Sequence, residues 1–469
     1  MEDGKKIRLR NRIIDVVIFV ILLAGVSAVT LVLFYRQTMG STAGFHSDMK
    51  AYILEMQGLD SGYHFPYPVF FRLGALIHLF APPELSVAIA TMALNSLGIV
   101  VTKLAFHHLA FERLEQGMFM WRFKGGMDSK RPDLSWLAGC LISVAAISLF
   151  FISMLFPPTG IYLPGIRFRY LGVFSPNPFH NATYMAARPF AVLAFLWFVK
   201  LLPVYEEGVR KTTGKDYILF SLFLLLATMT KPSFTLVMVS TAGLVMLYRL
   251  LRRGFRNFVP ALQLGLCFVP TFVDLLYQYQ GVFVPAEGEE GGVGFCFGEV
   301  WTQYCSNIVL AVGLAVGFPL LVLLLNYKEC RKNTYFGFSW QLYLVSFAEA
   351  FFLYEKGFRK YDFNFSWGYM YGIFFCHFCA LLVLLRKTAD KCGGSHGLKS
   401  FAGRKASFYM GQAEDGEGPE EEETGGRLPG RKKIWLESVL LAIQWLAYLG
   451  HVVCGLVYFK SIFGGAMYY

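Results

Sequence analysis

One carboxylate near the start of the chain stands out as a candidate for acid–base chemistry. Asp48 follows the first long hydrophobic run closely, in the sequence His46-Ser47-Asp48. A carboxylate within hydrogen-bond reach of a hydroxyl can take its proton and act as a general base. A structural interpretation is equally open, because Ser47 is a good helix N-cap and an acidic residue favours the positive end of a helix.

Lys231 is the most distinctive single cation. It lies between two short hydrophobic segments, in the sequence Lys231-Pro232-Ser233. A cation at membrane depth is by default a functional-site hypothesis. The alternative is a lysine whose apolar stem lies among the helices while its ammonium reaches the interface. Glu349 and Asp274, within later hydrophobic segments, are expected to pair locally.

Further cations fall between the hydrophobic runs. These are Arg167, Arg169, Lys356, Arg359 and Lys360. Arginine forks bind phosphate well, often through two parallel hydrogen bonds. The same side chains can equally pair with lipid headgroups, so a phosphate clamp and ordinary membrane contact both remain open.

The amino-acid composition indicates the kind of protein to which these residues belong. Of the 469 residues, 55% are hydrophobic and 16% are charged, whereas soluble domains carry about 25% charged residues. An ordinary soluble enzyme is excluded, and so is a disordered chain, which needs low hydrophobicity. The net charge of +11 is explained by cytoplasmic Lys and Arg flanking membrane spans. We therefore expect membrane lipids, and no nucleic acid, as partners.

The hydrophobic runs predict an all-α polytopic protein with about eleven transmembrane helices. The expected spans are 13–35, 86–106, 135–156, 184–202, 217–230, 234–250, 258–277, 307–326, 338–354, 367–385 and 434–459. With this count most Lys and Arg residues fall on one side, which predicts a cytoplasmic N-terminus and an extracytoplasmic C-terminus. The first outer loop, 36–85, is long and carries an expected interfacial helix at 67–80. A hairpin is expected at Lys231-Pro232, because proline cannot continue the hydrogen-bond ladder.

Three domains follow from these runs. Residues 1–385 form the expected transmembrane domain, 386–433 a charged cytoplasmic linker, and 434–469 a last helix with a short outer tail. The linker contains the acidic run Glu420-Glu421-Glu422-Glu423 and is expected to be disordered, with docking of a partner as the alternative. No internal repeat and no matching pair of broken helices is evident, which counts weakly against common secondary transporters.

The nine cysteines predict neither a zinc site nor a complete disulfide framework. Cys296 and Cys305 bound a short acidic loop, where a disulfide is one option on an oxidising face. Cys376 and Cys379 form a C-x-x-C sequence inside an apolar helix, which favours a structural role over a redox one.

An acidic residue shortly after the first span, followed by a Tyr-Pro-led interfacial helix, resembles the GT-C superfamily of integral-membrane glycosyltransferases. The matching pieces are His46-Ser47-Asp48-Met49-Lys50-Ala51-Tyr52, Phe65-Pro66-Tyr67-Pro68, His180-Asn181-Ala182-Thr183-Tyr184, Ala187-Arg188-Pro189-Phe190 and Thr230-Lys231-Pro232-Ser233. They cover residues 1–250 as an ordered set, and the rest of the chain agrees only in its number of spans.

The resemblance implies transfer of a sugar from a polyprenyl-phosphate donor to an acceptor hydroxyl on the extracytoplasmic face. The acceptor, whether a glycan, a lipid or a protein, is left open. Asp48 would be the general base. Substrate binding would fall to His46, Tyr52, Tyr67, His180, Asn181, Arg188 and Lys231, and binding of the lipid phosphate to Arg167, Arg169, Lys356, Arg359 and Lys360.

The resemblance is incomplete at one position, which bears on the mechanism. Many relatives carry a second acidic residue where this chain has Ser47. We therefore expect no cofactor and a metal-independent mechanism, although a divalent ion is not excluded. A single base suits inverting displacement, by analogy with glycosidases. The cell membrane is the expected location, although the sequence does not separate it from an endomembrane.

Two other functions remain in competition. A transporter or flippase for a lipid-linked saccharide would use the same outer cavity, but Lys103 and Glu349 are nearly the only charges within spans, which disfavours an ion-coupled pathway. An assembly or anchoring protein would instead depend on the acidic linker.

Overall fold

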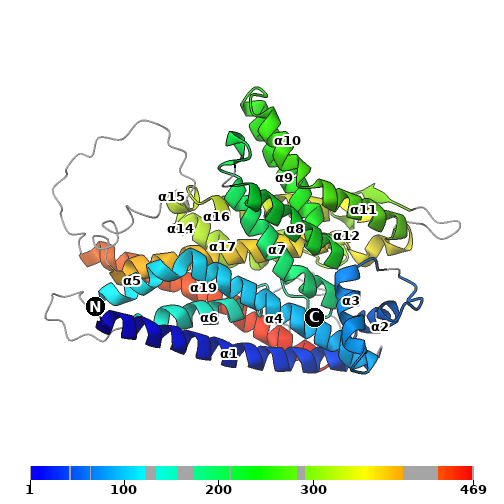
Figure 1. The fold of residues 1–469 in the computed structure, drawn as a ribbon, viewed down its shortest axis with the longest axis horizontal. Coiled ribbons are helices and arrows are strands. Elements are labelled where there is room, and N and C mark those ends of the chain that lie inside the picture. Colours follow the sequence, from blue (N-terminus) through cyan, green and yellow to red (C-terminus); the bar gives the residue numbers. More distant parts are fainter. Residues whose placement is uncertain are drawn as a thin grey trace.

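The computed structural model describes residues 2–41, 44–63, 65–121, 134–156, 174–210, 213–282, 291–393 and 431–466. These residues are mostly helical, and the long helices lie side by side as a bundle (Figure 1). Within the described ranges six helices are long and apolar enough to cross a membrane, or eight if each of two bent pairs is one span. This is the architecture of an all-α polytopic membrane protein.

The N-terminal half of the bundle is built from helices of very different length. They are α1 (Glu2–Thr38), α2 (Met49–Met56), α3 (Pro68–His78), α4 (Pro83–Phe106), the π-helical turn η1 (His107–Phe111), α5 (Glu112–Trp121), α6 (Leu137–Leu149), α7 (Ala182–Leu201), η3 (Tyr205–Glu207), α8 (Gly214–Thr230) and α9 (Ser233–Arg252).

The C-terminal half adds further helices and a two-stranded ribbon. They are α10 (Phe258–Leu266), α11 (Val269–Val282), β1 (Val293–Phe295), α12 (Glu299–Thr302), α13 (Ile308–Ala315), α14 (Gly317–Leu325), α15 (Tyr327–Cys330), α16 (Thr334–Phe352), β2 (Leu353–Glu355), η4 (Gly357–Asp362), α17 (Ser366–Gly393) and α19 (Arg431–Phe463). The ribbon is antiparallel, with Val293 opposite Glu355, and was not predicted.

The bundle has two distinct ends. At one end α1 and α19 both finish: Arg36 Nη1 donates to the Phe463 carbonyl over 3.2 Å, and Phe45 N donates to the Gly465 carbonyl over 3.3 Å. The short helices α2 and α3 lie at this same end, at the right of Figure 1. Residue 2, where α1 begins, lies at the opposite end. We call the end that carries α2 and α3 the α2–α3 end.

Helix α17 lies at the centre of the bundle. Its apolar side chains from Tyr369 to Leu385 are almost all fully buried, and it packs against α16, α5 and α14. Phe375 stacks on Phe195 of α7 with ring centroids 4.2 Å apart. A helix that is apolar all round is buried on every side, so α17 is the element around which the other helices assemble.

The helix boundaries agree with the predicted spans in part. Each predicted span contains a helix or a bent pair, but α6 has only 13 residues and α8 only 17, so the count of eleven is not confirmed. Helix α3 lies within the segment 67–80, where an interfacial helix was expected. Helix α17 continues to Gly393, inside the predicted linker, and residues 394–430 lie outside the described residues.

Two predicted spans are bent helix pairs, where the sequence predicted continuous helices. The α10–α11 pair bends by 50° and the α13–α14 pair by 69°. Pro270 and Pro319 lie in the first turns of α11 and α14, where a residue without an N–H group is tolerated and the preceding helix cannot continue through it. At the second break His451 Nε2 accepts a hydrogen bond from Phe318 N over 3.2 Å.

The described residues answer one of the questions that the cysteine spacing raised. Cys296 and Cys305 are free thiols, and their sulfurs point at different carbonyls, those of Phe351 and Asn307. No disulfide therefore closes this segment. Cys376 and Cys379 are free and buried in α17.

One charge within the predicted spans has a partner that was not predicted. Lys103 of α4 pairs with Asp15 of α1 over 2.9 Å, and Ser143 of α6 donates to the other oxygen of Asp15 over 2.8 Å. A buried charge is tolerated when it is paired and hydrogen-bonded. This contact ties α1, α4 and α6 together.

Candidate functional site

Asp48 precedes α2, yet its carboxylate does not cap that helix. The Ser47 hydroxyl accepts from Met49 N over 3.3 Å, and the Asp48 carboxylate turns to the side. There Tyr52, one turn along α2, donates from its hydroxyl to Asp48 Oδ2 over 3.1 Å. Asp48 therefore lies at the start of α2 without a side-chain cap bond, and both interpretations of Asp48 from sequence stay open.

Asn181 fixes the start of α7 and reaches Asp48 from the opposite side. As the N-cap, its Oδ1 accepts from Tyr184 N over 2.9 Å, which satisfies a backbone donor that the helix leaves open. This bond determines the orientation of the amide, so its Nδ2 is the atom that donates to Asp48 Oδ2 over 2.9 Å. Asn181 is 2% exposed, so the contact is held in place by packing.

Lys231 arrives from the turn between α8 and α9. A residue before proline is disfavoured in the helical conformation, and Lys231 has an extended backbone with φ −167° and ψ 125°. Its Nζ donates to Asn181 Oδ1 over 3.1 Å and to Thr183 Oγ1 over 3.4 Å. The Asn181 amide therefore joins the Asp48 carboxylate to the Lys231 ammonium. We call Asp48, Tyr52, Asn181, Thr183 and Lys231 the carboxylate–lysine cluster.

Aromatic rings surround the ammonium of this cluster. Lys231 Nζ lies 4.5 Å from the ring centroid of Trp367 and 5.8 Å from that of Tyr67, within the range of a cation–π contact. His180 and Tyr184 pack against the same Trp367, with ring centroids 5.6 and 5.5 Å away. Tyr67, His180 and Tyr184 lie in the sequence segments that resemble the GT-C superfamily, whereas Trp367 does not.

Trp367 is the residue of this site that sequence reasoning missed. It lies in the first turn of α17, and its indole donates to Asn364 Oδ1 over 3.2 Å. One more tryptophan at the start of a hydrophobic run carries no local signal of a site. Only the packing of α17 against α7 brings it there.

The electrostatics of the cluster follow from its burial. Lys231 is 6% exposed, and burial lowers its pKa to about 8, although the nearby Asp48 carboxylate acts in the opposite direction. Burial, reinforced by Asp48, raises the pKa of Tyr52, which keeps its hydroxyl a donor. Burial and the charge of Lys231 lower the pKa of His180, so its ring is neutral beside the ammonium.

Two further predicted substrate-binding residues are His46 and Arg188. His46 is exposed in the turn before α2, near enough to His180 that its charge helps to lower the pKa of that ring. Arg188 is 4% exposed and donates to Asn177 Oδ1 and to the Pro176 carbonyl. Its guanidinium faces the ring of Tyr184 at 5.7 Å, so that ring and Trp367 separate it from Lys231.

The cations predicted to bind lipid phosphate are partly neutralised. Arg359 lies 3.4 Å from Glu355 and 3.5 Å from Asp362. Lys360 pairs with Glu299 over 2.8 Å. Lys356 is exposed directly after β2, while Arg167 and Arg169 lie outside the described residues. Phosphate binding by these five residues stays a prediction.

The cluster combines a potential base with a potential anion stabiliser. Both hydrogen bonds to Asp48 reach Oδ2, so Oδ1 carries neither of them. Asp48 is half-buried while Lys231 lies deeper. Within the described ranges no three His, Cys, Asp or Glu side chains gather in a way that holds a metal ion.

The electrostatic link across the cluster has a measurable consequence. We predict that Lys231 in the wild-type protein loses its proton at about pH 8, and at lower pH in Asp48→Asn, because the carboxylate that favours the ammonium is gone. Competitive labelling with acetic anhydride over a pH series, read by mass spectrometry, measures the midpoint. Asp60→Asn, in the same outer loop, is the control and leaves it unchanged. A titration midpoint of Lys231 at about 10.4, the ordinary pKa of lysine, would contradict the electrostatic link between Asp48 and Lys231. So would a midpoint that Asp48→Asn does not change.

Comparison with known proteins adds no family to this geometry. No family model, no curated protein and no solved structure matches the chain. The functional conclusion therefore depends on the side chains of the carboxylate–lysine cluster and on their chemistry.

Proposed function

We propose that the protein is a membrane glycosyltransferase that moves a sugar from a polyprenyl-phosphate donor to an acceptor hydroxyl at the α2–α3 end. The observation that carries the proposal is the Asn181 amide, which accepts from Lys231 and donates to Asp48. It places a proton acceptor and a buried cation beside each other, and sugar transfer from a phosphate requires both.

The acceptor side of the reaction falls to Asp48. A hydroxyl is a weak nucleophile, and a carboxylate within about 3 Å takes its proton as attack proceeds. The acceptor oxygen bonds to the anomeric carbon, and the proton moves to Asp48. Tyr52 and Asn181 hold one carboxylate oxygen and so orient the other. With one base and no covalent sugar intermediate, the displacement inverts the anomeric centre.

The donor side falls to Lys231. As the bond between the anomeric carbon and the phosphate oxygen breaks, its electron pair leaves with the polyprenyl phosphate. A cation shielded from water stabilises that growing charge more than an exposed one does. The ammonium of Lys231 is held by Asn181, Thr183 and the Trp367 ring. The isoprenoid tail would lie between the helices, among their aromatic side chains.

The proposal includes a topology. With eleven spans, a cytoplasmic N-terminus and an extracytoplasmic C-terminus, the cluster faces outward, where lipid-linked sugars are used by enzymes of this kind. The distribution of Lys and Arg supports this orientation. So does the position of residue 2 at the end opposite to α2 and α3 (Figure 1). The cell membrane is the proposed location.

A transporter or flippase of a lipid-linked saccharide is the second candidate. The two bent helix pairs favour it, because broken helices often form transporter binding sites. At the α13–α14 break, however, the ring of His451 already occupies the helix start. At the α10–α11 break the Cys267 carbonyl accepts from Ser221 of α8, ten residues before Lys231. These contacts join neither break to the carboxylate–lysine cluster, which supports the transferase.

We predict that Asp48→Asn abolishes sugar transfer, because the amide cannot take the acceptor proton. The measurement is the release of polyprenyl phosphate by the purified protein, incubated with a panel of polyprenyl-phosphate sugars. Asp60→Asn, whose carboxylate bonds only the nearby Gly62 N among its described contacts, is the matched control and keeps wild-type turnover. Turnover by Asp48→Asn near the wild-type rate removes Asp48 as the base.

We predict that Lys231→Met slows transfer at least about tenfold, equal to about 1.4 kcal/mol of transition-state stabilisation. Methionine keeps the length of the side chain and removes its charge. Single-turnover rates and donor affinity, measured on the same panel, separate chemistry from binding. Lys50→Met, an exposed lysine of α2, is the control. Unchanged rate and affinity in Lys231→Met would leave Lys231 with a packing role only.

A further inference from the structure

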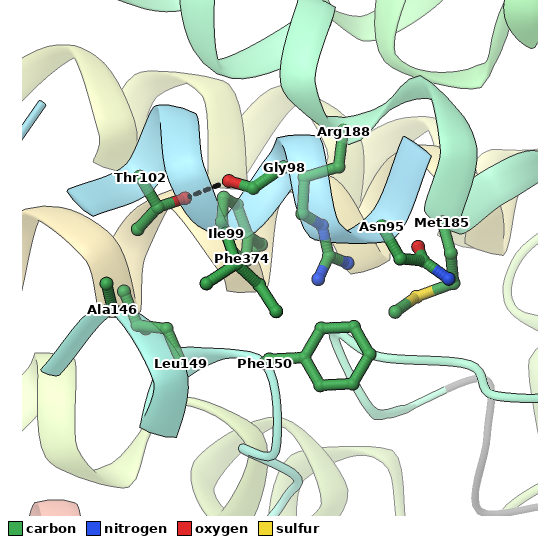
Figure 2. Close-up of a pocket in the computed structure, with 10 residues that line it drawn as sticks. All are labelled: Asn95, Gly98, Ile99, Thr102, Ala146, Leu149, Phe150, Met185, Arg188 and Phe374. Atoms are coloured by element: carbon green, nitrogen blue, oxygen red, sulfur yellow. Dashed lines mark hydrogen bonds between the residues drawn. The ribbon is translucent and has the colours of Figure 1, made fainter. Parts of the chain in front are cut away.

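A small hollow lies inside the bundle between α4, α7 and the end of α6. Its lining includes Asn95, Gly98, Phe150, Met185 and Arg188, and its cavity volume is about 10 Å³. That is room for about one water-sized particle. Figure 2 shows the guanidinium of Arg188 above the ring of Phe150 and the amide of Asn95 beside Met185, both on the lining of this hollow.

Arg188 brings a full positive charge to the hollow, and no carboxylate of the described ranges pairs with it. It is 4% exposed, and its guanidinium stands over the ring of Phe374 at 4.4 Å. Its Nη atoms donate to neutral oxygens of Asn177 and Pro176, while Nε has no hydrogen-bond partner in the described part of the chain. The preceding loop, 157–181, contains no Asp or Glu in its sequence, so it supplies no counter-charge.

Asn95 brings a second unsatisfied group to the same place. It is 3% exposed, and neither its Nδ2 nor its Oδ1 has a hydrogen-bond partner among the described residues. A buried polar group left without a partner costs about 1–3 kcal/mol. The neighbouring Thr102 hydroxyl is already used, since it donates to the Gly98 carbonyl over 2.8 Å. The open donors at the hollow are therefore Arg188 Nε and Asn95 Nδ2.

We propose that this hollow binds one small inorganic anion of the halide class, with chloride as its physiological occupant. Arg188 Nε and Asn95 Nδ2 are the donors, and the anion supplies the negative charge that the guanidinium lacks. A water molecule would satisfy the same donors but would leave the charge uncompensated in apolar surroundings, which is costly. The space is too small for a phosphate group. The bound anion fixes α4 to α7, the helix that carries Asn181, and the proposal does not depend on sugar transfer.

The test is the thermal unfolding midpoint of the purified full chain in sodium chloride and in sodium gluconate at equal ionic strength. Chloride that binds only the folded state raises the midpoint with its concentration, and we expect a shift of about 2 °C or more. Asn95→Leu abolishes the chloride-dependent part of the shift. Asn95→Asp also abolishes it, because its carboxylate compensates Arg188 directly. Ser96→Ala, which removes a hydroxyl bonded to Ser27 outside the hollow, keeps the wild-type shift.

A second measurement uses only the wild-type protein, so it tests the proposal even if the Asn95 variants fail to fold. Crystals of the wild-type protein grown in sodium bromide are expected to show an anomalous scattering peak between Arg188 and Asn95. Equal midpoints in chloride and gluconate, or a bromide data set without that peak, would overturn the proposal and leave water as the occupant. A chloride shift that survives in both Asn95→Leu and Asn95→Asp would place the halide elsewhere and overturn it as well.

Discussion

The Asn181 amide is the contact on which the arrangement of the α2–α3 end depends. One oxygen caps α7 and accepts from Lys231, and one nitrogen donates to Asp48. Because an amide has fixed donor and acceptor ends, the cap bond determines which charge lies on which side. Opposite charges that pair directly neutralise each other. Here a neutral group stands between them, so the two charges do not neutralise each other by direct pairing.

The bundle supports this cluster through helices that are distant in sequence. Asp48 comes from the start of α2, Asn181 from the start of α7, and Lys231 from the turn between α8 and α9. Helix α17 closes the site with Trp367 and packs along α7 through Phe375. Elsewhere in the bundle the Asp15–Lys103 pair is satisfied, whereas no carboxylate of the described residues pairs with Arg188. Buried cations thus occur in two settings, Lys103 bonded to a carboxylate and Arg188 bonded to neutral oxygens.

Local physics explains which features were predictable from sequence. Each hydrophobic run taken as a span contains a helix or a bent pair of helices, and the proline after Lys231 predicted the break between α8 and α9. The pairing of Lys103 with Asp15, the partners of Arg359 and the position of Trp367 depend on contacts between distant segments, which a single sequence does not encode locally. The bends in α10–α11 and α13–α14 were missed, because hydropathy averages over a proline. Asp48 and Lys231 were both named from sequence, but Asn181 as the link between them required the coordinates.

The most direct measurement is the structure, by electron cryomicroscopy, of the protein with a polyprenyl phosphate bound. The account predicts phosphate density in contact with Lys231 Nζ, on the side from which the free oxygen of Asp48 is reached, and an isoprenoid chain between the helices. Phosphate density on another surface, with Lys231 still bonded only to Asn181 and Thr183, would contradict the account.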